Sequence, residues 1–190
     1  MTRFAWLQGW SPAKLLIWGV GIGVFLSLIV ALGSSVVVKA TGTDTFCVSC
    51  HYMHPFRDAW LASPHGGQNP QGVVANCLGC HLPHKSYVGY LLAKAKTGAS
   101  HIYHHLLSDP YTWDWAGRAE TRREKFTYES GCRSCHVELT PPGMPRGGFR
   151  AHRAVMLGET SKTCTQCHPH VGHKNMLDMV DRYFGEKNEL

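Results

Sequence analysis

The eight cysteines of this 190-residue chain constrain its fold more than any other feature. They form four repeats of one pattern, in which two cysteines stand three positions apart and a histidine follows at once. The repeats are CVSCH at 47–51, CLGCH at 77–81, CRSCH at 132–136 and CTQCH at 164–168, and they use every cysteine. One C-x-x-C pair is typical of a thioredoxin-like redox site or of half a zinc site. Four copies, each with its histidine, favour covalent attachment of haem c instead.

Each repeat predicts one haem held by two thioether bonds. The predicted thioether residues are Cys47, Cys50, Cys77, Cys80, Cys132, Cys135, Cys164 and Cys167. The first candidate iron ligands are the repeat histidines, His51, His81, His136 and His168. Haem of this kind is attached outside the cytoplasm, where free thiols would otherwise oxidise to disulfides. We therefore expect most of the chain to lie on the outer face of a membrane.

An uncharged apolar segment runs from Leu15 to Val38, between Lys14 and Lys39. At about 1.5 Å per helical residue it is long enough to cross the roughly 30 Å of a bilayer core. A cleaved signal peptide has a shorter apolar core, of about 7–15 residues, although small residues near the end of the segment leave cleavage open. Basic residues before the segment predict a cytoplasmic N-terminus. The expected parts are a cytoplasmic N-terminus at 1–14, a transmembrane anchor at 15–38 and a tetrahaem domain at 39–190.

The domain at 39–190 is expected to be mainly α and irregular, with short helices around four haems. Its repeats form two pairs, 47–81 and 132–168, with a spacer between them. Glycine, proline and histidine interrupt nearly every segment, so long strands are not expected. Covalently bound haems would replace much of the apolar core. Within the spacer we expect a helix at 86–107 and a more polar surface helix at 111–128.

The formal charge of +6 does not predict a nucleic-acid-binding surface. The basic residues are scattered along the chain and form no block. Each ferric haem with two ionised propionates would add roughly one negative charge, which leaves about +2 on the complete protein.

Histidine is abundant enough to supply further iron ligands. The chain has 13 histidines. Those outside the repeats are His54, His65, His84, His101, His104, His105, His152, His170 and His173. Two imidazoles on one iron give a haem suited to electron transfer, and a methionine ligand raises its potential. The histidine content therefore supports the haem interpretation.

The order of motifs resembles the NapC/NirT/NrfH-type membrane-anchored tetrahaem cytochromes c, which are quinol dehydrogenases. The shared features are one N-terminal anchor, four CxxCH repeats and the blocks SPHGG, CHLPH, RAHRA and CHPHVGH. The resemblance implies three iron-ligand pairs, namely His65 with His168, His173 with His81, and His152 with His136. Three further histidines, His54, His84 and His170, are expected at the surface or against haem propionates.

The first repeat differs from the others because Met53 follows His51 by two residues. In NrfH-like members a methionine at this place binds iron and the repeat histidine does not. The alternative is that Met53 is a packing residue and His51 binds iron in the ordinary way. Both interpretations stay open.

The resemblance also implies a quinol site on the helix at 86–107. Members of the family carry a lysine there and an acidic residue seven positions later. Lys94 and His101 occupy these positions, and Lys96 is a rival for the lysine role. Residues seven apart share one helical face. Histidine in place of the acid could accept a proton, or it could bind the first iron and close it to quinol. A zinc site from His101 and His105 is a further hypothesis, which lacks a third ligand.

The implied function is oxidation of membrane quinol and transfer of the electrons to a periplasmic multihaem reductase. The chain would be a single-pass protein of the cytoplasmic membrane, with its haem domain in the periplasm. It would associate as a homo-oligomer or in a stable complex with its partner enzyme. The same relay run in reverse, from a soluble dehydrogenase to quinone, is one alternative. The others are a small terminal reductase for nitrite or hydroxylamine, and a structural anchor for a partner.

Overall fold

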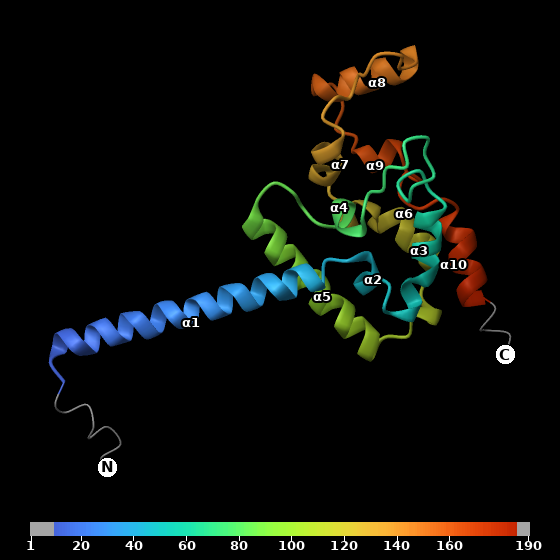
Figure 1. The fold of residues 1–190 in the computed structure, drawn as a ribbon. Coiled ribbons are helices and arrows are strands. Elements are labelled where there is room, and N and C mark those ends of the chain that lie inside the picture. Colours follow the sequence, from blue (N-terminus) through green and yellow to red (C-terminus); the bar gives the residue numbers. More distant parts are fainter. Residues whose placement is uncertain (1–9, 186–190) are drawn as a thin grey trace. The chain divides into compact units, whose positions relative to one another are not determined.

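The computed structural model describes residues 10–185 of the chain, except for the side chain of His51. The chain divides into two units, Met1–Gly42 and Thr43–Leu190. Residues 10–185 contain ten α-helices and no strand, only an isolated bridge between Gly66 and Val74. The expected fold class, mainly helical with one N-terminal apolar helix, is confirmed (Figure 1).

The first unit consists of one long apolar helix, α1 (Pro12–Ala40), with 29 residues and a mean hydropathy of 2.6 in its most apolar window. Ser11 caps its start, because the Ser11 side chain accepts a hydrogen bond from the Lys14 amide. Serine hydroxyls inside the helix bond back to its own carbonyls, as Ser27 does to Gly23 at 2.8 Å. Its polar groups are therefore satisfied internally, as a lipid environment requires. Length and composition are those of a helix that can span a membrane.

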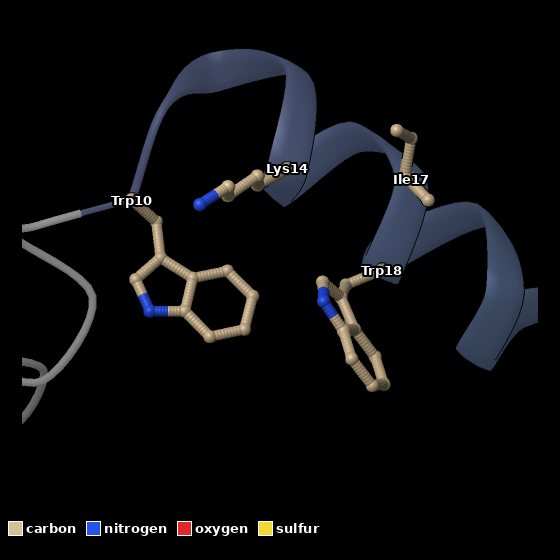
Figure 2. A pocket seen from close by; sticks show the side chains of 4 residues that line it. All are labelled: Trp10, Lys14, Ile17 and Trp18. Atoms are coloured by element: carbon tan, nitrogen blue, oxygen red, sulfur yellow. The ribbon is translucent and has the colours of Figure 1, made fainter.

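Aromatic and basic side chains gather at the start of α1. The rings of Trp10 and Trp18 lie 6.0 Å apart, and with Lys14 and Ile17 they line a shallow pocket (Figure 2). Tryptophan and lysine at the end of an apolar helix fit the polar boundary of a bilayer. Trp6 lies outside the described residues.

The second unit is built mainly from short helices, four of which contain cysteines of the repeats. They are α2 (Asp44–Cys47), α3 (His54–Leu61), α4 (Cys77–His81), α5 (Tyr87–Leu107), α6 (Trp115–Phe126), α7 (Glu129–Cys135), α8 (Arg146–Met156), α9 (Cys164–Cys167) and α10 (Met176–Gly185). A side chain caps several of these helices; Asn76 caps α4, and Thr163 forms a capping box with Gln166 at α9. Capping allows one-turn helices to hold their cysteines in place, although such helices are too short to be stable alone.

The two helices expected in the spacer turn out differently. The helix at 86–107 is confirmed as α5, which begins after the cap Ser86 and continues through Gly98. The single helix expected at 111–128 is wrong, because a 3-10 turn at Pro110–Thr112 precedes α6, which begins only after Asp114. The Asp114 carboxylate accepts a hydrogen bond from the amide of Gly117 at 2.8 Å and so fixes the start of α6.

A small aromatic cluster forms the core beneath the first repeat. Tyr52, Val180 and Phe184 are buried there, where α3 packs against α10. Trp115 of α6 stacks on Phe184 with ring centres 5.4 Å apart. The surface role expected for this segment is therefore wrong at its first turn. Few other apolar side chains in the described residues are buried, which is consistent with a domain whose core needs prosthetic groups.

Helices α4 and α7, which carry the second and third repeats, meet backbone to backbone. The amide of Tyr128 donates to the carbonyl of Cys80 at 2.9 Å. Gly131 of α7 is buried, and a Cβ atom at this residue would collide with the carbonyl oxygen of Gly79. Because the obstacle is backbone rather than a movable side chain, this approach requires glycine.

Gly131→Ala should therefore lower the stability of the haem-loaded protein by about 1–3 kcal/mol, a cost typical of overpacking. The measurement is the thermal midpoint followed by circular dichroism. Gly147→Ala on α8 is the matched control, because a Cβ there meets nothing within 4 Å, and it should leave the midpoint unchanged or raise it slightly. Equal midpoints for both variants would contradict the close approach of α4 and α7.

Candidate functional site

Three pairs of histidine rings lie at the spacing that two ligands of one iron require. The ring centres are 6.1 Å apart for His81 and His173, 6.0 Å for His65 and His136, and 6.0 Å for His152 and His168. With metal–nitrogen bonds of about 2 Å, opposed imidazoles place their ring centres about 6 Å apart. Each pair contains one repeat histidine and one histidine from elsewhere in the chain.

Backbone carbonyls fix the orientation of four of these rings. In each ring the Nδ1 atom lies within hydrogen-bond distance of a main-chain oxygen. The distances are 2.8 Å from His65 to the oxygen of Val171, 2.7 Å from His81 to that of Phe126, 2.6 Å from His152 to that of Leu139 and 2.9 Å from His173 to that of Phe56. A carbonyl oxygen only accepts, so Nδ1 must donate and carry the proton. The lone pair is thereby left on Nε2, which is the arrangement of a metal-binding histidine oriented by a second hydrogen bond.

Burial favours the neutral form of the His81–His173 pair. It lowers the pKa of His173 to about 4, with a further lowering from the charge of His81. It also lowers the pKa of His81, against a smaller opposing effect of the hydrogen bond to Phe126. Neutral imidazole is the form that binds a metal, so this pair needs no deprotonation near neutral pH.

One of the three ring pairs is an expected ligand pair, and the other two differ from the expected pairs. His173 lies against His81 as expected. His65 lies against His136 rather than His168, and His152 lies against His168 rather than His136. The physical reason is local: His152 sits on α8, which leads directly into the fourth repeat. A motif identifies a histidine but does not fix which repeat it reaches.

Consecutive repeats lie next to one another in the fold. Helix α2 of the first repeat contacts α4 of the second, and an interaction with Cys77 lowers the pKa of Cys47 to about 7. The amide of Tyr128, next to the third repeat, donates to the carbonyl of Cys80 in the second, and Glu129 beside the third repeat accepts from the amide of Cys164 in the fourth. The repeats therefore make contact in the order one, two, three, four.

Two acidic side chains join neighbouring repeats, and sequence reasoning missed both. Asp44 accepts a hydrogen bond from the amide of Cys77 at 2.8 Å, and Glu129 accepts one from the amide of Cys164 at 2.9 Å. Each lies three residues before a repeat cysteine of its own helix, and this recurring position is the signal that could have identified them.

Met53 lies half-buried against the aromatic core, beside Tyr52. This contact is compatible with either role proposed for Met53. The side chain of His51 is outside the described residues, so the choice between the two ligands stays a prediction.

Tyr52 connects the first repeat to α5 and was also missed from sequence. Its ring is buried, its hydroxyl donates to the main-chain oxygen of His101 at 3.5 Å, and it lies 6.1 Å from the ring of His105. Burial, with the charge of Cys50, raises the pKa of Tyr52 to about 12. The hydroxyl therefore stays protonated and can keep donating to α5.

Lys94 presents a buried amine on the inner side of α5. Its Nζ atom is shielded from solvent, has no hydrogen-bond partner within residues 10–185, and lies 6.0 Å from the centre of the Tyr90 ring. Burial lowers the pKa of Lys94, and the charge of Cys47 opposes this effect. The influence of Cys47 on this pKa also indicates that Lys94 lies near the first repeat. Its rival Lys96 is exposed.

His101 lies two helical turns from Lys94, near the second repeat. The side chain of His101 is exposed, but loss of hydration beside neighbouring atoms lowers its pKa, and the charges of His81 and His104 lower that pKa further. No group of three or more potential metal ligands occurs among the described residues, so the zinc hypothesis for His101 and His105 gains no third ligand.

The remaining histidines have other partners. The His54 ring lies near Tyr183 and the His84 ring lies edge-on to Tyr90, and both histidines are exposed. His104 bonds Ser108 at 2.9 Å and lies edge-on to Trp113. His170 is exposed. The residues that could hold haem are therefore the eight repeat cysteines and the three histidine pairs, with the first repeat completed by His51 or Met53.

A single apolar helix followed by four CxxCH repeats and three paired imidazoles defines a membrane-anchored tetrahaem c-type cytochrome. The chain belongs to the NapC/NirT cytochrome c family, whose N-terminal region model matches residues 10–179. Membership in this family implies four covalently bound haems c. The cysteine positions and the oriented Nε2 atoms of the histidine pairs fit such groups.

Individual relatives support the same assignment over most of the chain. The tetraheme c-type cytochrome CymA of Shewanella oneidensis is 33% identical over 165 residues, which cover 80% of this chain and 87% of CymA. The cytochrome c nitrite reductase subunit NrfH of Nitratidesulfovibrio vulgaris is 30% identical and is covered, like this chain, to 92%. The crystal structure of a nitrite reductase NrfHA complex bound to the HQNO inhibitor matches with a TM-score of 0.50 and 30% identity, over 85% of this chain and 92% of the matched chain.

The ligand pairs can be tested by combining substitutions and counting high-spin haems. His65→Ala together with His136→Ala should alter a single haem, because both rings face the same iron position. His65→Ala together with His168→Ala should alter two haems, because these rings belong to different pairs. The measurement is electron paramagnetic resonance, normalised to the haem content from pyridine haemochrome spectra.

The first double variant remains informative if the third haem fails to attach. The other three haems then keep their ligands and should stay low-spin. A high-spin signal among those three would contradict the pairing of His65 with His136.

Proposed function

We propose that the chain oxidises membrane quinol and delivers the electrons to a periplasmic multihaem reductase. The observation that carries this proposal is the buried amine of Lys94, which has no hydrogen-bond partner in the described part of the chain and lies near the first repeat. An unpartnered buried polar group calls for an explanation, and a ligand that supplies the missing partner is one. A quinol hydroxyl can donate to the neutral amine.

The inner face of α5 would bind and orient the quinol headgroup. Lys94 and His101 are seven residues apart and so share one side of the helix. Tyr52 donates to the main-chain oxygen of His101 and thereby holds this stretch of α5 against the first repeat. In this proposal Lys94 accepts a proton from one quinol hydroxyl, and His101 is the second candidate acceptor.

Quinol releases two electrons and two protons, and the site must receive both. When bound, the haems supply one-electron acceptors, and the sequential contact of the four repeats gives them an order. The protein's own part is to position the headgroup and to receive protons at Nζ of Lys94 and at the imidazole of His101.

The partner and the location are parts of the same proposal. The NrfHA complex shows a relative bound to a nitrite reductase, and we propose a multihaem oxidoreductase as the partner of this chain too. Lys14 in the first turn of α1 and the covalent haems favour a cytoplasmic N-terminus and a periplasmic haem domain. The proposed parts keep the bounds 1–14, 15–38 and 39–190. Self-association stays a further expectation.

Electron flow in the reverse direction, from a soluble dehydrogenase to quinone, uses the same residues. A terminal reductase for nitrite or hydroxylamine is disfavoured, because such chemistry needs an open iron position. Three of the four repeats already have a second imidazole at ligand distance. Only the first repeat lacks a partner ring of this kind among the described residues.

Lys94→Met should slow haem reduction by quinol by at least about tenfold, because loss of a general base typically costs more than that. The measurement is anaerobic stopped-flow absorption with a quinol in nanodiscs. Lys96→Met is the matched control, since Lys96 is exposed on the same helix, and it should react at the wild-type rate. Reduction by dithionite should be complete in all three proteins, and HQNO should slow quinol reduction. Equal rates for the two variants would contradict the role of Lys94.

The rate should also depend on pH through Lys94. Burial lowers the pKa of Lys94 from 10.5. The opposing charge of Cys47 disappears when that thiol becomes a neutral thioether, so the lowering is then unopposed. Only the neutral amine accepts a proton, so the rate should rise with pH through this lowered pKa and level off above it. Lys94→Met should lack this rise. If the rate of the variant still rises with pH as in the wild-type protein, another group is responsible for the pH dependence.

A further inference from the structure

Two carboxylates join helices of neighbouring repeats in the same way. Asp44 is the first residue of α2, and its Oδ1 atom accepts a hydrogen bond at 2.8 Å from the amide of Cys77, the first residue of α4. Glu129 is the first residue of α7, and its Oε1 atom accepts one at 2.9 Å from the amide of Cys164, the first residue of α9. We call these contacts the carboxylate bridges. One bridge joins repeats one and two, and the other joins repeats three and four.

Each bridge completes the hydrogen bonding at the start of a helix. The first amides of a helix have no partner within that helix. At α4 the Asn76 side chain accepts from the amide of Gly79, and at α9 the Thr163 side chain accepts from that of Gln166. The capping residues therefore serve the third position of each helix. The first amide, which belongs to a haem-binding cysteine, is served by the carboxylate from the preceding repeat. A charged acceptor makes a shorter and stronger hydrogen bond than a neutral one.

The contact between repeats two and three is of another kind. The amide of Tyr128 donates to the carbonyl of Cys80, and Gly131 approaches the carbonyl of Gly79. This contact is made by main-chain atoms. The haem domain therefore contains two similar units, repeats one with two and repeats three with four, and each unit has the same internal link.

We propose that Asp44 and Glu129 are positioning residues for electron transfer, each of which fixes the separation of two haems and lowers the potentials of both. Each carboxylate lies three residues before one thioether cysteine and bonds the main chain of another. Loss of a bridge would therefore let one haem attachment point move relative to the other. The proposal rests on the four haems of the family. It does not depend on quinol oxidation or on the direction of electron flow.

The negative charge of each bridge acts on the same two haems whose attachment points the bridge joins. In transfer within a pair, one electron leaves a ferrous haem and reduces the ferric haem beside it. The ferric form has one more positive charge than the ferrous form, so a neighbouring carboxylate stabilises the ferric form and lowers the reduction potential. A carboxylate placed between two haems lowers both potentials together.

Neutral isosteric variants of the haem-loaded full chain test the effect of charge. Asp44→Asn and Glu129→Gln keep an oxygen that can accept from the same amide. Each variant should attach four haems and raise the midpoint potentials of two of them, measured by spectroelectrochemical titration. The double variant should raise all four potentials, because the bridges belong to different pairs. The matched control is Asp58→Asn on α3, where the Asp58 carboxylate pairs with Arg57 at 3.5 Å. It should shift the potentials less.

Alanine variants test the effect on haem separation, because they remove the acceptor as well as the charge. Neighbouring ferric haems split and broaden each other's electron paramagnetic resonance signals, and this magnetic coupling depends steeply on their separation. The wild-type protein and Asp44→Asn should show the same coupling. Asp44→Ala should show altered coupling at two haems, and Asp58→Ala should match the wild-type protein.

Several results would overturn the proposal. They are an absence of magnetic coupling in the wild-type protein, identical coupling in Asp44→Ala and the wild-type protein, and potentials of Asp44→Asn that shift no more than those of the control. If Asp44→Ala attaches fewer than four haems, the haem content of Asp44→Asn decides. Four haems in Asp44→Asn would support the bridge, whereas equal loss in both variants would overturn it. Since no quinol is present, these results are independent of the test on Lys94.

Discussion

Pairing of distant imidazoles is the interaction on which the haem domain depends. His173 near the C-terminal end lies against His81, and its Nδ1 atom bonds the carbonyl of Phe56 in α3. His65, in the first half of the chain, lies against His136 and bonds the carbonyl of Val171. Each ring is thus held by one segment while facing another. A metal between two such rings would tie the halves of the chain together, so that cofactor binding and folding become one process.

This dependence explains the small apolar core. The buried aromatic cluster of Tyr52, Val180 and Phe184 secures only the region beneath the first repeat. Elsewhere the short helices α4 and α9 are held by side-chain caps, and α7 is held by the Glu129 carboxylate and by backbone contact at Gly131. These contacts set cysteines in position but bury little apolar surface. The family assignment explains what completes the core, namely four haems.

The sequence predicted those parts that depend on residues close together in the chain. The repeats predicted haem attachment, the uninterrupted apolar run predicted α1, and the apolar residues within 86–107 predicted α5. The pairing of His65 with His136 and of His152 with His168 was not predictable, because it depends on how α8 and the loop after α3 fold back. The burial of the Lys94 amine was not predictable either. A period of 3.6 residues does not say which side of a helix packs against the rest of its domain.

The central claim is that quinol in the membrane reduces this cytochrome at the side of the domain formed by α5 and the first repeat. The most direct measurement is anaerobic stopped-flow spectroscopy of the wild-type protein in nanodiscs that contain either menaquinol or ubiquinol. The account predicts that haem absorption shifts to the reduced form with at least one of the two quinols. If neither quinol reduces any haem while dithionite reduces all four, the chain is not a quinol dehydrogenase.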